Sequence, residues 1–177
     1  MFMSEGEGEP IPQYLESINV AFQLTKGGMF DHEYVEFRYT GGHLSIDCSV
    51  HYSEGGLAYT VFAMIQDEFD LDKRDEMIKI ANYANISTRF GSMIAGMPRD
   101  DKFGVWVRLS NADADTPDPS VIDAMISNAC RTMDWYYPAI MKVVWGGMDA
   151  DEAVKFAHSG DDDDSTPPPP PPISGYQ

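Results

Sequence analysis

Histidine, carboxylate and thiol side chains are the groups in this 177-residue chain that could bind a metal ion or act as nucleophiles. His43, Asp47 and His51 recur at every fourth position in a segment that alternates polar and apolar residues up to Tyr52. Such alternation predicts a strand, in which the two histidines would lie about 26 Å apart at about 3.3 Å per residue. One metal ion cannot bind both of them. We therefore interpret the three residues as a solvated strand face.

Two cysteines, Cys48 and Cys130, lie far apart in the sequence, and each belongs to an apolar periodic pattern. Cys48 alternates in phase with apolar neighbours, so its side chain should point into the core, where a thiol is inert as a nucleophile. The spacing is that of neither a disulfide framework nor a metal knuckle. We expect two small buried hydrophobic residues in a reducing compartment.

Carboxylates gather in two further segments. Asp67, Glu68, Asp70 and Asp72 suggest calcium, but the segment lacks the turn glycine and the distal glutamate of a calcium-binding helix-loop-helix motif. We interpret these acids as a solvated approach to a helix. Asp113, Asp115 and Asp118 could act as general acid and base only around a pocket that the sequence does not reveal, so we interpret them as loop solvation and helix capping.

Glycines at Gly27, Gly41, Gly55 and Gly146 fit turns and caps, because none belongs to a phosphate-binding glycine motif. The sequence thus offers no catalytic, cofactor-binding or metal-binding residues. We expect a protein that is not an enzyme and that carries neither cofactor nor metal.

The net charge of the chain limits the classes of partner that it can bind. Its 29 acidic and 12 basic side chains give a formal net charge of −17. Such a surface repels phosphate backbones and anionic lipid headgroups, so we expect neither nucleic acid nor membrane as a partner. Glu5, Glu7 and Glu9 stand where a signal peptide would carry positive charge, which favours a cytoplasmic location.

The elements that position these residues follow from hydrophobic periodicity. Apolar residues recur at helical spacing from Ile11 to Phe22, and Gly27 with Gly28 would end that helix. Later segments have the alternation and the turn residues that are typical of strands. The expected strands cover Tyr34–Tyr39, Leu44–Tyr52, Leu57–Ile65, Thr88–Met97 and Phe103–Leu109.

Three more helices are expected. Asp72 starts the first, which ends near Asn85. Asp118 before Pro119 predicts the start of a long helix that continues through Pro138 to the glycines at 146 and 147. Asp149 followed by Glu152 predicts a capped last helix through His158.

The predicted fold is α+β, in the order α-β-β-β-α-β-β-α, with an antiparallel sheet of about five strands packed by helices. Residues 1–10 should form a flexible leader, 11–158 one domain, and 159–177 an acidic and proline-rich disordered tail. The tail contains six consecutive prolines, Pro167–Pro172. It can serve as a spacer, or as a ligand for an aromatic groove.

Four segments resemble the YbjN family, with its type III secretion chaperone-like fold: Ile80–Asn85, Phe90–Ser92, Asp134–Ile140 and Val144–Ala153. The resemblance extends roughly from Tyr14 to Ala157. These motifs are structural in kind, with aromatic packing, a glycine stop and a capped helix. The resemblance implies a bacterial cytoplasmic protein of chaperone-like or regulatory type, with no catalytic residues to transfer. The proline-rich tail departs from the family pattern.

Apolar residues on strand faces opposite to the core suggest an interface. The candidates are Phe62, Met64, Met93 or Ile94, and Trp106. The first hypothesis is a protein-binding module, chaperone-like or regulatory, that acts on an unidentified protein partner. The alternative is a small-molecule-responsive regulator with a pocket between the sheet and the long helix.

Self-association is a more specific form of the first hypothesis. The strand Leu57–Ile65 is apolar on both faces, and Trp106 lies outside the core pattern. The chaperones that this fold resembles are dimeric. We therefore expect a homodimer formed through the sheet.

Removal of residues 161–177 tests the predicted domain boundary. Because none of the periodic apolar positions lies in residues 161–177, the truncated protein should unfold at nearly the same temperature as the full chain. Calorimetry of both proteins measures this. A fall of more than about 5 °C, equivalent to about 1 to 2 kcal/mol, would contradict the prediction and show that the tail docks on the domain.

Overall fold

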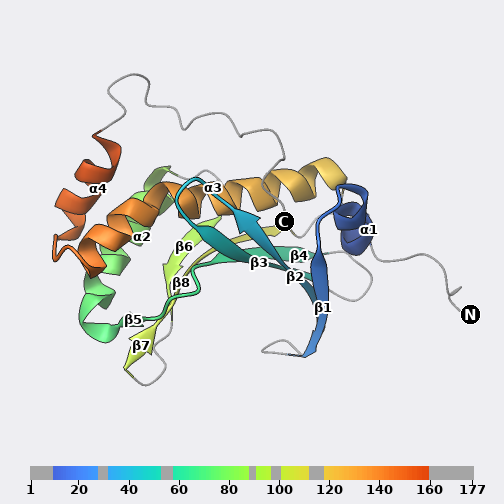
Figure 1. Cartoon of the computed structure of the whole chain (residues 1–177), viewed down its shortest axis with the longest axis horizontal. Helices are drawn as coiled ribbons and strands as arrows, with labels where there is room; N and C mark the ends of the chain where they lie inside the picture. Colours follow the sequence, from blue (N-terminus) through green and yellow to red (C-terminus); the bar gives the residue numbers. More distant parts are fainter. Residues whose placement is uncertain are drawn as a thin grey trace, which may run out of the picture.

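The computed structural model describes residues 10–27, 32–52, 58–87, 91–96, 101–111 and 118–159 (Figure 1). The expected leader before Pro10 and the tail after Ser159 lie outside these residues, as do Gly55, Asp113 and Asp115. None of the helices in the described ranges is long and apolar enough to cross a membrane.

The predicted α+β fold with an antiparallel sheet is confirmed, and the main sheet has six strands rather than about five. Its spatial order is β1-β2-β3-β4-β8-β6, and each neighbouring pair is antiparallel. Two short strands, β5 (Phe69–Asp70) and β7 (Lys102–Phe103), form a second small sheet that the sequence did not predict. The six strands are β1 (Phe22–Gly27), β2 (His32–Thr40), β3 (Ser45–Tyr52), β4 (Tyr59–Met64), β6 (Ser92–Ala95) and β8 (Val105–Asn111).

Alternation of side chains gives this sheet two different faces, because successive residues of a strand point to opposite sides. On one face, here called the inner face, the side chains are buried and apolar. Val61 and Ala63 of β4 and Val107 of β8 belong to it. The remaining inner residues are Val35, Phe37, Tyr39, Ile46, Cys48, Val50, Tyr59, Met93, Val105 and Leu109.

One long helix, α3 (Pro119–Val144), lies along the inner face (Figure 1). The predicted cap is confirmed, since the Asp118 side chain accepts a hydrogen bond from the backbone N–H of Ser120 at 2.8 Å. Pro138 lies inside the helix, as expected. Its buried positions are Ile122, Met125, Ile126, Ala129, Cys130, Met133, Tyr136, Ala139, Ile140 and Val143.

The other helices pack against α3. They are α1 (Pro10–Ser17), α2 (Arg74–Ser87), which follows the short 3₁₀ helix η1 (Leu71–Lys73), and α4 (Ala150–His158). Glu76 of α2 holds the start of α4, because its Oε2 accepts a hydrogen bond from the backbone N–H of Ala150 at 2.7 Å. Hydrogen bonds from Lys79 and from Ala150 lower the pKa of Glu76. The predicted Asp149 cap is confirmed by its 2.9 Å bond from the backbone N–H of Glu152.

The first helix is shorter than expected, and the prediction that it continues through Phe22 was wrong. The backbone N–H of Val20 donates to the Leu15 carbonyl, and that of Asn19 donates to the Glu16 carbonyl. Asn19 has a φ of 56°, the left-handed conformation that ends many helices. Asparagine tolerates this conformation better than most residues. The chain therefore turns at Asn19, and Phe22 begins a strand that pairs with β2.

The edge strand β6 is held by a side chain of the preceding helix. The Asn85 Oδ1 atom accepts a hydrogen bond from the backbone N–H of Met93 at 2.7 Å, and its Nδ2 donates to the Met93 carbonyl at 3.1 Å. An amide side chain presents the same donor and acceptor as a peptide group. Asn85 therefore occupies, at one residue, the place that a further strand would take.

The turn between β2 and β3 is fastened to α3 by Asp134. Its carboxylate accepts hydrogen bonds from the backbone N–H of Gly42 at 3.0 Å and from that of His43 at 2.8 Å. The carboxylate lies so close to Gly41 that a Cβ there would be 2.4 Å from Asp134 Oδ1. Only glycine leaves this space free.

A double-mutant cycle on Gly41 and Asp134 tests this anchor. Gly41→Ala alone should destabilise the protein by about 1 to 3 kcal/mol, because the added methyl group displaces the carboxylate and breaks its two hydrogen bonds. In an Asp134→Ala background the same substitution should cost much less, since the crowding atoms are gone. Urea unfolding of the four proteins gives the coupling energy. Strictly additive effects would contradict the proposed contact.

Candidate protein-binding face

The predicted interface residues occupy mostly one side of the sheet. Phe62 and Met64 of β4, Ile94 of β6 and Trp106 of β8 are half-buried and lie on the face opposite to α3, here called the outer face. Met93 does not belong to it, which corrects the prediction for that residue. The Met93 side chain is 3% exposed and points into the core, because neighbouring residues of a strand point to opposite sides.

Three of these side chains form a row across the sheet. Met64 of β4 is paired in register with Trp106 of β8, and Trp106 is paired with Ile94 of β6. Directly paired side chains on one face of an antiparallel sheet lie within contact distance of each other. The three predicted residues therefore form one continuous apolar strip over the last three strands of the sheet.

The Trp106 ring is seated over two glycines. A Cβ added at Gly96 would lie 1.9 Å from Cζ3 of the indole, whereas a Cβ at Gly104 would lie 3.7 Å from the same atom. The backbone N–H of Gly96 donates to the Gly104 carbonyl at 2.7 Å. The absence of a Cβ at Gly96 thus gives the indole the space that it occupies.

An aromatic row that the sequence did not reveal continues the strip across β2, β3 and β4. The Tyr34 and His51 rings are stacked with centroids 4.4 Å apart, and the His51 ring meets the edge of Phe62 at 5.1 Å. The His51 Nε2 atom lies 3.1 Å from Oγ of Ser49, which is only 2% exposed although it lies on this face. The row was missed because it depends on strand register, which no local pattern encodes.

Polar side chains surround these apolar rows. Asp47 is paired with Arg38 at 3.1 Å and accepts a hydrogen bond from Gln66 at 2.7 Å. Glu36 accepts a hydrogen bond from Thr25 at 2.8 Å. With Arg108, the described charged residues of this face are two acids and two bases, whereas the chain as a whole carries −17. The described charges of the outer face therefore cancel, although the protein as a whole is acidic.

The proposed solvated strand face has separate partners for each of its residues. His43 lies in the turn before β3 with its Nδ1 3.4 Å from Asp134, Asp47 pairs with Arg38, and His51 stacks on Tyr34. In the part of the chain that the structure describes, no three His, Cys, Asp or Glu residues are grouped as a metal site would require.

The acidic segments also have local partners. The four acids at positions 67, 68, 70 and 72 are all exposed. Asp70 forms an ion pair with Lys102, and Asp72 pairs with Lys73 at 3.4 Å. Asp118 caps α3, and hydrogen bonds from the side chain and backbone of Ser120 lower its pKa.

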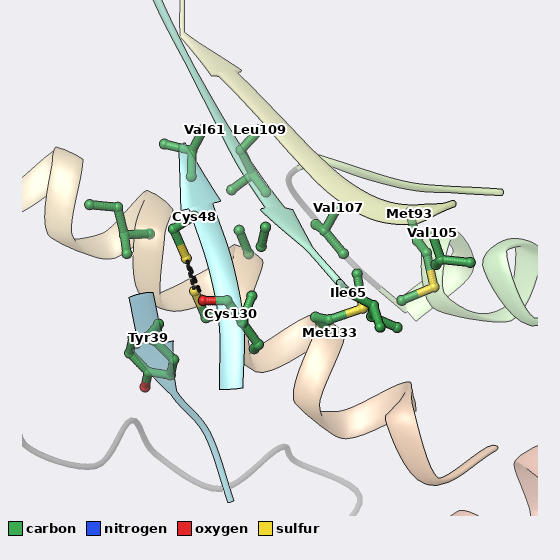
Figure 2. Close-up of a cluster of buried hydrophobic side chains, with 14 of the residues drawn as sticks. Tyr39, Cys48, Val61, Ile65, Met93, Val105, Val107, Leu109, Cys130 and Met133 are labelled. Carbon is green, nitrogen blue, oxygen red and sulfur yellow. Dashed lines mark hydrogen bonds between the residues drawn. The ribbon is translucent and has the colours of Figure 1, made fainter. Parts of the chain in front are cut away.

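Cys48 and Cys130 are both buried, as predicted, and both are free thiols. The sequence did not indicate that they meet: their Sγ atoms lie 3.2 Å apart between β3 and α3 (Figure 2).

The layer between the sheet and α3 is lined by buried apolar side chains. Figure 2 shows Val61, Val107 and Leu109 of the sheet on the side that faces Cys130 and Met133 of α3, and all five are buried. The alternative, a small-molecule pocket in this layer, stays a prediction.

Comparison with known proteins bears on the fold. No protein-family model matches the chain, and no curated protein matches it. Among solved structures, the crystal structure of YbjN, described as a candidate transcription regulator from E. coli, is similar to this chain with a TM-score of 0.52. The chain has a YbjN-like fold. The likeness covers 72% of this chain and 88% of YbjN at 10% sequence identity, so family membership stays a prediction.

The segments that suggested the resemblance have structural tasks in this YbjN-like fold. Asn85 holds β6, Asp134 holds the β2–β3 turn, and Asp149 caps α4. The Trp135 ring stacks on His158 with centroids 4.9 Å apart, which joins α3 to α4. These residues of the motifs therefore contribute to the packing of the fold.

Substitutions at the two glycines near Trp106 test how the indole is seated. In a chain whose Trp135 and Trp145 are replaced by Phe, Gly96→Ala should displace the indole and shift its fluorescence, at a cost of about 1 to 3 kcal/mol in stability. Gly104→Ala is the matched control, because its Cβ makes only an ordinary contact with the ring. Equal spectra for the two variants would contradict the observed placement of Trp106.

Proposed function

We propose that this protein is a non-catalytic protein-binding module that contacts its partner through the outer face. The observation that carries the proposal is the continuous strip of Met64, Trp106 and Ile94, joined at Phe62 by the aromatic row. The core does not use these side chains, since the inner face already packs against α3. An apolar centre with a polar rim is the usual composition of a protein interface.

The charges support a protein partner over a nucleic acid. A net charge of −17 opposes binding to phosphate backbones. On the outer face, Arg38 and Arg108 offset Glu36 and Asp47, so a neutral or mixed protein surface could approach without strong repulsion. Aromatic residues and arginine are the residue types most enriched at such interfaces.

More specifically, the proposed role is the regulation of another protein in a bacterial cytoplasm. It is supported by the description of YbjN as a candidate transcription regulator and by the sequence motifs that resemble its family. With its acidic surface, this chain would act on another protein rather than on DNA. Chaperone-like protection of a partner's apolar segment uses the same face.

A second copy of the chain is the first partner to test. In a two-fold dimer, Trp106 and Met64 would meet their own counterparts, so one apolar strip would serve both subunits. Trp106→Glu would then place an unpaired charge in the buried centre and should raise the dimer dissociation constant at least about 100-fold, equivalent to about 3 kcal/mol. Analytical ultracentrifugation over a range of protein concentrations measures this.

Ile86→Glu is the matched control. Ile86 is 85% exposed on α2, away from the outer face, so the same change there should leave the mass unaffected. Met64→Glu provides a second variant on the strip, and circular dichroism shows whether each variant is folded. A wild-type chain that stays monomeric at high micromolar concentration would rule out the dimer, and partner capture with the same variants would then test the face itself.

A further inference from the structure

Two thiols from distant parts of the chain face each other at the centre of the core. Cys48 lies on the inner face of β3 and Cys130 on the buried side of α3, 82 residues later. Their Sγ atoms are 3.2 Å apart, with no other group drawn between them in Figure 2. The side chains are 1% and 0% exposed. The pair joins the middle of the sheet to the helix that covers it.

In the reduced protein, hydrogen bonds connect the two thiols with each other and with the backbone. The Cys48 thiol lies within hydrogen-bond reach of the Ile46 carbonyl, with its Sγ 3.8 Å from the oxygen, and either thiol can donate in the bond between the two sulfur atoms. Burial, and then this bond to Cys48, raise the pKa of Cys130 well above its ordinary value. The Cys130 thiol is therefore protonated in the reduced protein.

We propose that Cys48 and Cys130 form a site of reversible disulfide formation, which fastens α3 covalently to β3 when the protein meets a low-molecular-weight disulfide. The thiolate of one cysteine attacks the reagent, forms a mixed disulfide and releases one thiol. The thiolate of the second cysteine then attacks the protein sulfur of that mixed disulfide and releases the other thiol. Two protein thiols are oxidised, one small disulfide is reduced to two thiols, and the two protons pass to the products.

The geometry requires little movement. A disulfide has its sulfur atoms about 2.05 Å apart, so the two Sγ atoms would approach by about 1.2 Å. Both side chains already point at each other across one layer of packing (Figure 2). Access is the slow step, because the buried thiols react only when α3 separates briefly from the sheet.

The bond would act mainly on the unfolded chain. It closes a loop that contains β4, α2, β6 and β8, and closure of a loop of this length removes much of the freedom of the unfolded state. We expect the oxidised protein to unfold about 10 °C above the reduced protein. Its native fold should be unchanged, because the helix and the strand are already in contact.

Incubation of the reduced full-length protein with bis(2-hydroxyethyl) disulfide tests the proposal. Intact mass should fall by two hydrogen atoms, and the count of free thiols should fall from two to none. A digest should contain one peptide pair joined through Cys48 and Cys130. Dithiothreitol should restore the original mass and the lower unfolding temperature.

Cys130→Ser is the matched control, since it removes one sulfur atom with little change in size. This variant should add one mixed disulfide at Cys48 and should show no rise in unfolding temperature. The proposal is overturned if the wild-type protein keeps both thiols, stops at mixed disulfides or forms intermolecular bonds. It is equally overturned if the internal disulfide forms only in denaturant, or if the joined protein loses its native circular dichroism.

Discussion

Burial of α3 against the inner face of the sheet is the contact on which the other elements depend. At 26 residues the helix is about 39 Å long, enough to reach beyond the central strands and meet all three other helices. Asp134 fastens it to the β2–β3 turn, and Tyr14 of α1 donates a hydrogen bond to its Asp123 at 2.8 Å. Because the described helices gather around α3 on the inner side, the apolar residues of the outer face take no part in this contact.

Most of the fold could be predicted because its signals are local. Alternation placed the inner residues of β3, β4 and β8, and Asp118 and Asp149 capped the helices that they were expected to start. The exception at Asn19 shows the limit of such signals. The apolar spacing up to Phe22 suits a helix, but a single residue in the left-handed conformation ends it, and pairing with β2 then decides the strand.

The candidate site was predictable only in part, for a related reason. Phe62, Met64 and Trp106 followed from their position opposite to core residues, whereas Met93 and Ile94 could not be told apart without the phase of a four-residue strand. The stacking of Tyr34 on His51, and the approach of Cys48 to Cys130, join residues far apart in the sequence. Long-range register and helix placement fix these contacts, and a single sequence does not contain them as a pattern.

Strand β3 contributes residues both to the proposed protein-binding face and to the proposed disulfide. Its odd-numbered residues, Asp47, Ser49 and His51, belong to the outer face, while Cys48 between them meets α3 in the core. A covalent bond at Cys48 would therefore restrain the backbone of β3, which carries His51 of the aromatic row. Such a restraint reduces the motion of the face without changing its composition.

Asn85 has a consequence for how the protein behaves at high concentration. An edge strand offers unpaired backbone groups to any other extended chain, and this is the usual start of aggregation. The Asn85 amide forms hydrogen bonds with both the N–H and the carbonyl of Met93. It therefore occupies the outward-facing backbone groups of that residue on a strand that is only four residues long. Growth of a fibril by strand addition at β6 would first have to break these two bonds, so a single side chain protects the sheet from becoming a polymer at this edge.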